Sequence, residues 1–251
     1  MKFPLGIVAD EIDRDFAKAV KIGTSLGIRR YEVRHLVSGR APMCDEAELR
    51  EVQRVAADEG VEITALSPGL FKLVDGATSF RREMSEVYPR AAEWAKRWKL
   101  PGLIVFGFLR GTDGVGAMFA EAETRAAADG LKLFVEPEPV CEIGTARAAA
   151  ALGLKINYDP GNVAWLQERD PIAEFEAAAP LIANVHVKDL THGGENPEWM
   201  PAGEGLIDWR AHLAALRGIG YAGRISLEPH MDGRPETIRR CIDAFNNCWG
   251  E

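Results

Sequence analysis

The sequence of 251 residues predicts an α/β fold, a single-domain (β/α)₈ TIM barrel that spans residues 1–251. Short apolar runs alternate with longer amphipathic stretches along the whole chain, which is typical of parallel strands joined by helical crossovers. Polar residues follow several of these runs, as expected when a barrel carries its site at the carboxyl ends of its strands. An open doubly wound sheet would share the alternation, but Ala9-Asp10-Glu11-Ile12 after the first run lacks the glycine fingerprint of such a sheet.

Eight segments are expected to form the strands of this barrel. Each is short, apolar or β-branched, and each is followed by loop residues such as Gly, Pro or Asp. The segments are Phe3–Val8, Arg30–Val33, Val61–Leu66, Leu103–Phe106, Leu131–Val135, Lys155–Tyr158, Ile182–Val187 and Arg224–Leu227.

Helical patterns lie between these segments. Asp45 and Glu48 have the spacing of a capping box, and the amphipathic stretch that they open stops at Gly60. Residues 80–99 place apolar side chains at i, i+3, i+4 and i+7, which predicts a helix with one apolar face. Asp15 stands where the first helix should begin and suits the positive end of the helix dipole.

Composition narrows the class of partner and the compartment. The net charge of −8 disfavours a nucleic-acid partner, because an acidic surface repels a phosphate backbone. The four cysteines form no CxxC pair, which fits a reducing cytoplasm. No apolar run approaches the about 20 residues of a membrane span, and no secretory signal is visible. We therefore expect a cytoplasmic protein with no membrane partner, and homo-oligomerisation stays open.

The residues at the ends of the later strands carry the chemistry. Glu136, Asp159, His186 and Glu228 each follow or end a different expected strand. Parallel barrel strands all end at one face, so these side chains can converge. Three oxygen donors and one nitrogen donor favour a divalent ion such as Mn²⁺, Mg²⁺ or Co²⁺, with Zn²⁺ also open.

Four short motifs carry these residues in order, and they resemble one family. The motifs are Phe134-Val135-Glu136-Pro137, Tyr158-Asp159-Pro160-Gly161-Asn162, Val185-His186-Val187-Lys188-Asp189 and Ser226-Leu227-Glu228-Pro229. This series is similar to the xylose isomerase-like sugar isomerase and epimerase family, which also includes dehydratases and the endonuclease IV branch. The segment Gly203-Glu204-Gly205 with Asp208-Trp209 resembles the loop after the seventh strand of that family.

The resemblance implies that Glu136, Asp159, His186 and Glu228 ligate one metal ion, and that Glu136 and Glu228 also transfer protons. A metal that holds a keto oxygen and a neighbouring hydroxyl acidifies the C–H between them and stabilises the enediolate. A carboxylate on each side of that carbon can remove the proton and return it. The implied activity is isomerisation or epimerisation of a keto sugar, or of a related small hydroxy-carbonyl compound.

Other polar residues near these strand ends are candidates for substrate binding. Lys188 lies on the same side of its strand as His186, so it binds a substrate oxygen or neutralises excess carboxylate. His230 and His35 are further candidates. Asn162 stands where some family members have a substrate-binding histidine, which leaves the exact sugar chemistry open. For Glu32 a structural ion pair is favoured over a ligand role.

Three alternative functions are weighed against the isomerase. A dehydratase of the inosose or dehydroshikimate type would use the same metal site, and the sequence does not separate it from an isomerase. An endonuclease IV-like repair enzyme is disfavoured, because the chain has five histidines and a net charge of −8. A non-catalytic binding protein is disfavoured because all four expected ligands are present.

Overall fold

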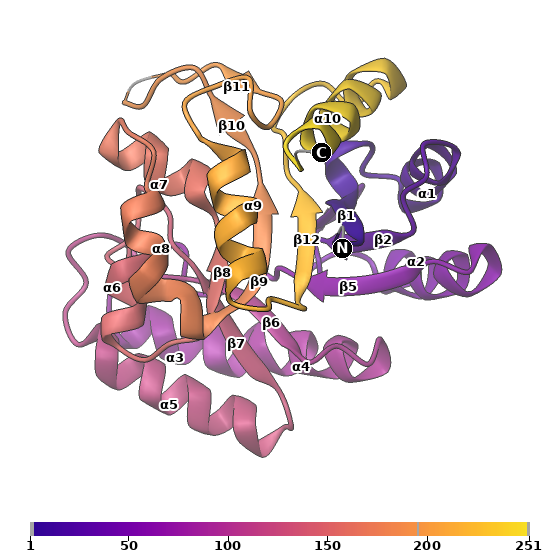
Figure 1. The fold of residues 1–251 in the computed structure, drawn as a ribbon. Helices are drawn as coiled ribbons and strands as arrows, with labels where there is room; N and C mark the ends of the chain where they lie inside the picture. The colour runs from indigo at the N-terminus through magenta and orange to yellow at the C-terminus, as the bar shows by residue number, and fades with distance from the viewer. Residues whose placement is uncertain (1–2, 195, 250–251) are drawn as a thin grey trace.

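The computed structural model describes residues 3–194 and 196–249. Eight parallel strands form one sheet that curls into a nearly closed barrel, with the helices outside it (Figure 1). Hydrogen bonds join the strands in the order β5-β2-β1-β12-β9-β8-β7-β6. The end strands β5 and β6 contact each other, although no ladder joins them in the described part of the chain. The predicted (β/α)₈ TIM barrel is confirmed.

The eight predicted strands all form, with boundaries within two residues of those expected. Each is short because a barrel strand needs only a few residues to cross the core. The barrel strands are β1 (Leu5–Val8), β2 (Arg30–Val33), β5 (Glu62–Leu66), β6 (Gly102–Phe106), β7 (Lys132–Glu136), β8 (Ile156–Tyr158), β9 (Ile182–Val187) and β12 (Arg224–Leu227). Two small hairpins stand apart from the barrel sheet, β3 (His35–Leu36) with β4 (Gly39–Arg40) and β10 (Asp189–Leu190) with β11 (Trp199–Met200).

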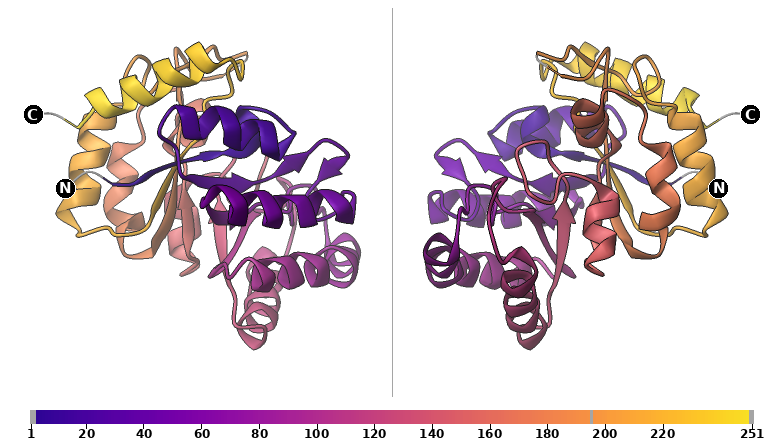
Figure 2. Two further views of the ribbon diagram at one scale, coloured as in Figure 1. Left: turned by 90° about the vertical axis from the view of Figure 1, so that its right-hand side faces the viewer. Right: turned by 90° about the vertical axis from the view of Figure 1, so that its left-hand side faces the viewer.

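Helices connect the strands and cover the outside of the barrel. They are α1 (Phe16–Ser25), α2 (Glu46–Glu59), α3 (Ala77–Glu86), α4 (Tyr88–Arg97), α5 (Val115–Ala128), α6 (Ala146–Ala151), α7 (Pro160–Gln167), α8 (Ile172–Ala178), α9 (Trp209–Gly218) and α10 (Pro235–Asn247), with short 3₁₀ turns η1 (Ala9–Glu11) and η2 (Ala179–Leu181). The views of Figure 2 show the indigo N-terminal and yellow C-terminal segments next to each other, as the pairing of β1 with β12 requires. No helix among the described residues is both long and apolar enough to span a membrane.

Two local expectations about helices are corrected. The stretch 80–99 is two helices, since α3 ends at Glu86 and α4 begins at Tyr88. Pro89 stands in the first turn of α4, where its missing N–H costs nothing, whereas inside one long helix it would remove a hydrogen bond. The expected capping box of α2 is also absent, because Glu48 instead accepts hydrogen bonds from the backbone and hydroxyl of Ser38.

Apolar packing leaves the inside of the barrel polar where the site lies. Most buried apolar side chains form one large cluster, which includes the helices and the outward faces of the strands. Only a small second cluster is separate from it, made of Ala65, Ile104 and Phe134. In β9, Val185 and Val187 belong to the large cluster. Asn184 and His186 alternate with these valines, so they point into the barrel, where both contact Glu32.

Candidate metal centre

Four buried side chains meet at the carboxyl ends of four strands. Glu136 ends β7, Asp159 follows β8, His186 lies within β9 and Glu228 follows β12. One ligand atom from each lies within 4.8 Å of the others. These four strands are consecutive in the sheet order, β12-β9-β8-β7, so their ends converge. The set that the sequence singled out is thus brought together in space.

The imidazole of His186 is oriented by an acid on the far side of the ring. Its Nε2 lies 2.8 Å from Glu32 Oε2, while its Nδ1 faces Glu228 at 3.3 Å and Glu136 at 3.5 Å. Glu32 also accepts hydrogen bonds from Asn184 and Ser226 at 3.0 and 2.6 Å. In the neutral imidazole a proton on Nε2 leaves the lone pair on Nδ1, which faces the acids and also lies 3.2 Å from Asn157 Nδ2.

Neutral amides hold the carboxylate of Glu136. Asn157 donates to Oε2 at 3.1 Å, and Asn162 donates to Oε1 at 3.2 Å. The backbone N–H of Asn162 also donates to Asp159 at 3.0 Å, so that Asp159 caps α7. Asn162 thus lies among the candidate ligands and fixes two of them.

Cations hold the carboxylate of Glu228 instead. Arg34 forms an ion pair with Glu228 Oε1, and Lys188 lies 2.8 Å from Glu228 Oε2. Arg34 is itself anchored by Glu11 at 2.6 Å and by Asp10 at 3.0 Å. The two proposed proton-transfer acids therefore sit in different environments, one among amides and one among cations.

Lys188 lies in the middle of the acids. Its ammonium is 2.7 Å from Asp159 Oδ2, and only 2% of the residue is exposed. The chain makes room for it at Gly161, where a Cβ would stand 2.5 Å from Lys188 Cγ. Of the two roles that the sequence left open for Lys188, these contacts favour neutralisation of carboxylate charge.

Burial and neighbouring charges shift the pKa values of this cluster in different directions. Burial raises the pKa of Asp159 to about 6, although Lys188 opposes the shift. Burial disfavours a charged His186, but the surrounding glutamates outweigh it and hold the imidazole pKa well above its ordinary value. Burial likewise opposes a charged Glu228, but Lys188 and His186 hold its pKa well below the usual range.

The donor set fits a divalent cation. The ligand carboxylates of Glu136, Asp159 and Glu228 carry a charge of −3, which Lys188 and one divalent ion would balance. Among the described residues, the buried Asp159 Oδ2 has the ammonium of Lys188 as its one polar partner, at 2.7 Å. A carboxylate oxygen with one such partner keeps a lone pair for a cation. Three oxygens and one imidazole suit Mn²⁺, Mg²⁺, Co²⁺ or Zn²⁺.

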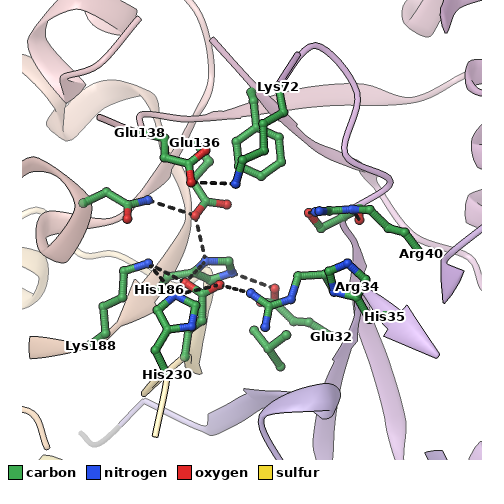
Figure 3. A pocket seen from close by; sticks show the side chains of 15 residues that line it. Glu32, Arg34, His35, Arg40, Lys72, Glu136, Glu138, His186, Lys188 and His230 are labelled. Atoms are coloured by element: carbon green, nitrogen blue, oxygen red, sulfur yellow. Dashed lines mark hydrogen bonds and ion pairs between the residues drawn. The ribbon is translucent and has the colours of Figure 1, made fainter. Parts of the chain in front are cut away.

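The cluster opens into a pocket, and Glu136, His186 and Glu228 are among the side chains that line it. Figure 3 shows its side chains, including His230 and His35, which the sequence named as candidates for substrate contact. His230 lies 3.2 Å from Glu11, and its ring packs against Trp199 with the centroids 4.9 Å apart. His35 lies 3.3 Å from Asp10.

Several pocket residues were not found from the sequence. Arg34 had a usable signal, because it stands two residues after Glu32 and so points to the same side of β2. Arg40, Lys72, Phe106 and Glu138 gave no signal, because they come from loops and strand ends whose neighbours are set only by the closed barrel.

The loop after β9 is fixed by Asp189. Its carboxylate accepts backbone hydrogen bonds from Leu190, Gly203, Gly205 and Ile207 at 2.9–3.2 Å. A Cβ at Gly205 would lie 2.5 Å from this carboxylate, which explains a glycine there. The loop carries Trp199, whose ring packs against His230 of the pocket. Asp189 therefore indirectly holds the aromatic neighbour of a pocket residue.

Residues 21–248 match the family model described as xylose isomerase-like TIM barrel. No curated protein is similar enough in sequence to count as a significant match.

Solved structures share the fold at low sequence identity. An IolI protein with a bound zinc atom is 16% identical, with a TM-score of 0.78 and coverage of 99% of this chain and 100% of the other. AsbF from Bacillus anthracis, a probable 3-DHS dehydratase, is 17% identical, with a TM-score of 0.74 and coverage of 98% and 99%. YcjR from E. coli, a 3-keto-D-glucoside 4-epimerase in its apo form, is 17% identical, with a TM-score of 0.71 and coverage of 98% and 99%.

Proposed function

Because the chain belongs to the xylose isomerase-like TIM-barrel family, we propose that it is a divalent-metal-dependent isomerase or epimerase. Its substrate would be a keto sugar or a related small hydroxy-carbonyl compound. The observation that carries this proposal is the buried cluster of Glu136, Asp159, His186 and Glu228, whose ligand atoms lie within 4.8 Å of one another at the base of a pocket. The 3-keto-D-glucoside 4-epimerase among the structural neighbours supports the reaction as analogy, and the zinc atom bound to the IolI protein supports a metal in the same way.

The four clustered side chains would hold the ion, and Glu32 would keep His186 Nδ1 directed at it. When bound, the cation would polarise the substrate carbonyl and make the adjacent C–H more acidic. Mn²⁺, Mg²⁺ and Co²⁺ are the favoured ions, and the zinc in the IolI structure keeps Zn²⁺ among the candidates.

Glu136 is the better placed of the two acids to act as base. Cations stabilise the carboxylate of Glu228 and hold its pKa well below the usual range, which weakens it as a proton acceptor. Glu136 is held by the neutral amides of Asn157 and Asn162. Burial opposes its charge and His186 lowers its pKa, but not as far as the cations lower the pKa of Glu228. We therefore assign proton removal to Glu136. In an epimerisation Glu228 would take a proton from solvent and pass it to the other face of the same carbon, while Glu136 releases the proton it removed to solvent.

Metal affinity is expected to fall as the pH is lowered from 7 to 5. Asp159 has a pKa raised to about 6, and the pKa of His186 is raised well above its ordinary value, so protons compete with the cation at both ligands. Displacing one proton gives about a tenfold loss of affinity per pH unit. Calorimetric titration with Mn²⁺ at several pH values measures this slope. An affinity that is the same at pH 5 and pH 7 contradicts the assignment of these ligands.

The proposed reaction is tested with a panel of ketoses, ketose phosphates, keto-hydroxy acids and cyclic keto-polyols incubated in D₂O with the Mn²⁺-loaded protein. Proton NMR should show deuterium exchange and a new isomer without loss of water. No exchange with any member of the panel, in protein shown to bind metal, counts against the isomerase.

A dehydratase remains the second candidate, because the same carboxylate base would begin the elimination of a β-hydroxyl. The probable dehydratase AsbF among the structural neighbours favours it as analogy. In the same NMR assay, loss of water instead of simple exchange identifies this activity.

A further inference from the structure

Arg40 reaches the pocket from the β3–β4 hairpin. Its Nε donates to the carbonyl of Ser67 at 3.1 Å and its Nη2 to the hydroxyl at 3.0 Å, whereas Nη1 has no hydrogen bond among the described residues. The guanidinium lies against Gly69, where a Cβ would stand 2.8 Å from Nε. Figure 3 shows the head group on the side of the pocket opposite Lys188, directed toward the middle.

Arg40 differs from the other lysine and arginine side chains of the pocket in its partners. Arg34 pairs with Asp10, Glu11 and Glu228; Lys72 pairs with Glu138 at 2.6 Å; and Lys188 pairs with Asp159 and Glu228. Arg40 forms no ion pair with any residue in 3–194 or 196–249. Within the described part of the chain, its hydrogen-bond acceptors are the two neutral oxygens of Ser67.

A mostly buried guanidinium without a carboxylate in ion-pair contact is costly, because it has lost water and is only partly compensated by more distant charges. Burial and the like charge of Arg34 lower the pKa of Arg40, and together they outweigh the attraction of Glu136, Asp10 and Glu138. Lys72 and Arg40 both stand over the ring of Phe106, at 4.8 Å for Lys72 Nζ and 5.6 Å for Arg40 Cζ. Because Lys72 is paired with Glu138, the charge that has no ion-pair partner at this aromatic ring is that of Arg40.

We propose that Arg40, with Lys72 beside it, forms a subsite for an oxyanion of the substrate, either a carboxylate or a phosphate ester. The inference rests on the proposed function, since the same substrate would present its hydroxy-carbonyl end to the Glu136–Glu228 cluster. The planar fork of a guanidinium matches two oxygens of either anion. The substrate class is therefore a keto-hydroxy acid or a sugar phosphate, and not a neutral sugar.

The test compares three five-carbon probes that differ at one end: xylitol, D-xylonate and D-xylitol 5-phosphate. Each is titrated calorimetrically into the Mn²⁺-loaded full chain. At least one anionic probe should bind about tenfold or more tightly than xylitol, and which one does so distinguishes a carboxylate from a phosphate subsite. Arg40→Gln should weaken that probe by about 10–100-fold, as expected for losing hydrogen bonds from a charged donor. The affinities for xylitol and for Mn²⁺ should not change.

Arg81→Gln, an exposed arginine on α3, is the matched control and should leave every affinity unchanged. Arg40→Lys should keep part of the preference for the anion. Thermal melting of the variant shows whether the substitution has damaged the fold. The subsite is wrong if neither anionic probe binds more tightly than xylitol, or if Arg40→Gln retains the preference.

Failure of the subsite can be told apart from failure of the proposed function. If the protein binds Mn²⁺ and exchanges deuterium but shows no preference for anions, only the proposed subsite is contradicted. If the protein binds no metal, the proposed function is contradicted. The subsite can still be tested in the metal-free protein, by measuring whether binding of the same probes depends on Arg40.

Discussion

Replacing Glu136 with glutamine is expected to lower turnover by at least about 10²–10⁴-fold, the range for losing a general base. The carboxamide can still offer an oxygen to a cation, but it cannot take a proton from carbon. The substitution keeps the shape of the side chain. The new NH₂ group of the glutamine would, however, face the NH₂ group of either Asn157 or Asn162, which now donates to an oxygen of Glu136. We therefore expect metal binding to be retained, at reduced affinity.

The loss is measured by deuterium exchange and product formation in the NMR assay, with Mn²⁺ binding followed by calorimetry. Glu121→Gln, an exposed position on α5, is the matched control and should keep full turnover. If Glu136→Gln retains turnover close to that of the parent protein, Glu136 is only a ligand. Lys188 would then be the next candidate for the base.

The corresponding Glu228→Gln variant distinguishes the two candidate reactions. In an epimerase that uses Glu136 and Glu228 on opposite faces, the variant should still exchange deuterium into one stereoisomer, because Glu136 can deprotonate from its own face. In a dehydratase the same variant should keep exchange but lose elimination, if Glu228 assists departure of the hydroxyl. Complete loss of exchange together with normal metal binding would instead assign the base to Glu228.

Replacing His186 with glutamine is expected to weaken Mn²⁺ binding by more than about 100-fold, because it removes the nitrogen ligand itself and not merely its hydrogen-bonding partner. Activity should fall in parallel. The fold should survive, since the amide of glutamine can still donate to Glu32, which also keeps Asn184 and Ser226 as partners. Calorimetry measures the metal affinity and thermal melting measures the stability.

Two further variants make this result specific. His192→Gln alters an exposed histidine outside the cluster and should leave metal binding unchanged. Glu32→Gln should weaken the metal by a smaller factor, about 10–100-fold, because it disturbs only the orientation of His186. Normal Mn²⁺ affinity in His186→Gln would remove His186 from the ligand set.

The fold could be predicted almost fully from the sequence. The barrel strands are recognisable because each is a short apolar run, and their boundaries move by no more than two residues in the structure. Helix details were less predictable. The division of residues 80–99 into two helices depends on Pro89, and the missing capping box depends on the hydrogen bond from Ser38 to Glu48. The periodicity of apolar residues describes neither of these local effects.

The sequence by itself determined that Glu136, Asp159, His186 and Glu228 would share one rim, because parallel strands of a barrel end on the same face. Only the tertiary structure decided the environment of each. Glu32 is far from His186 in sequence, yet it bonds to Nε2 because β2 faces β9 across the barrel. Arg34 and Arg40 stand six residues apart, but one is matched by three acids and the other by none of the described residues. Closure of the sheet and the loops above it fix which charges face one another. The spacing of residues along the chain does not predict those distances.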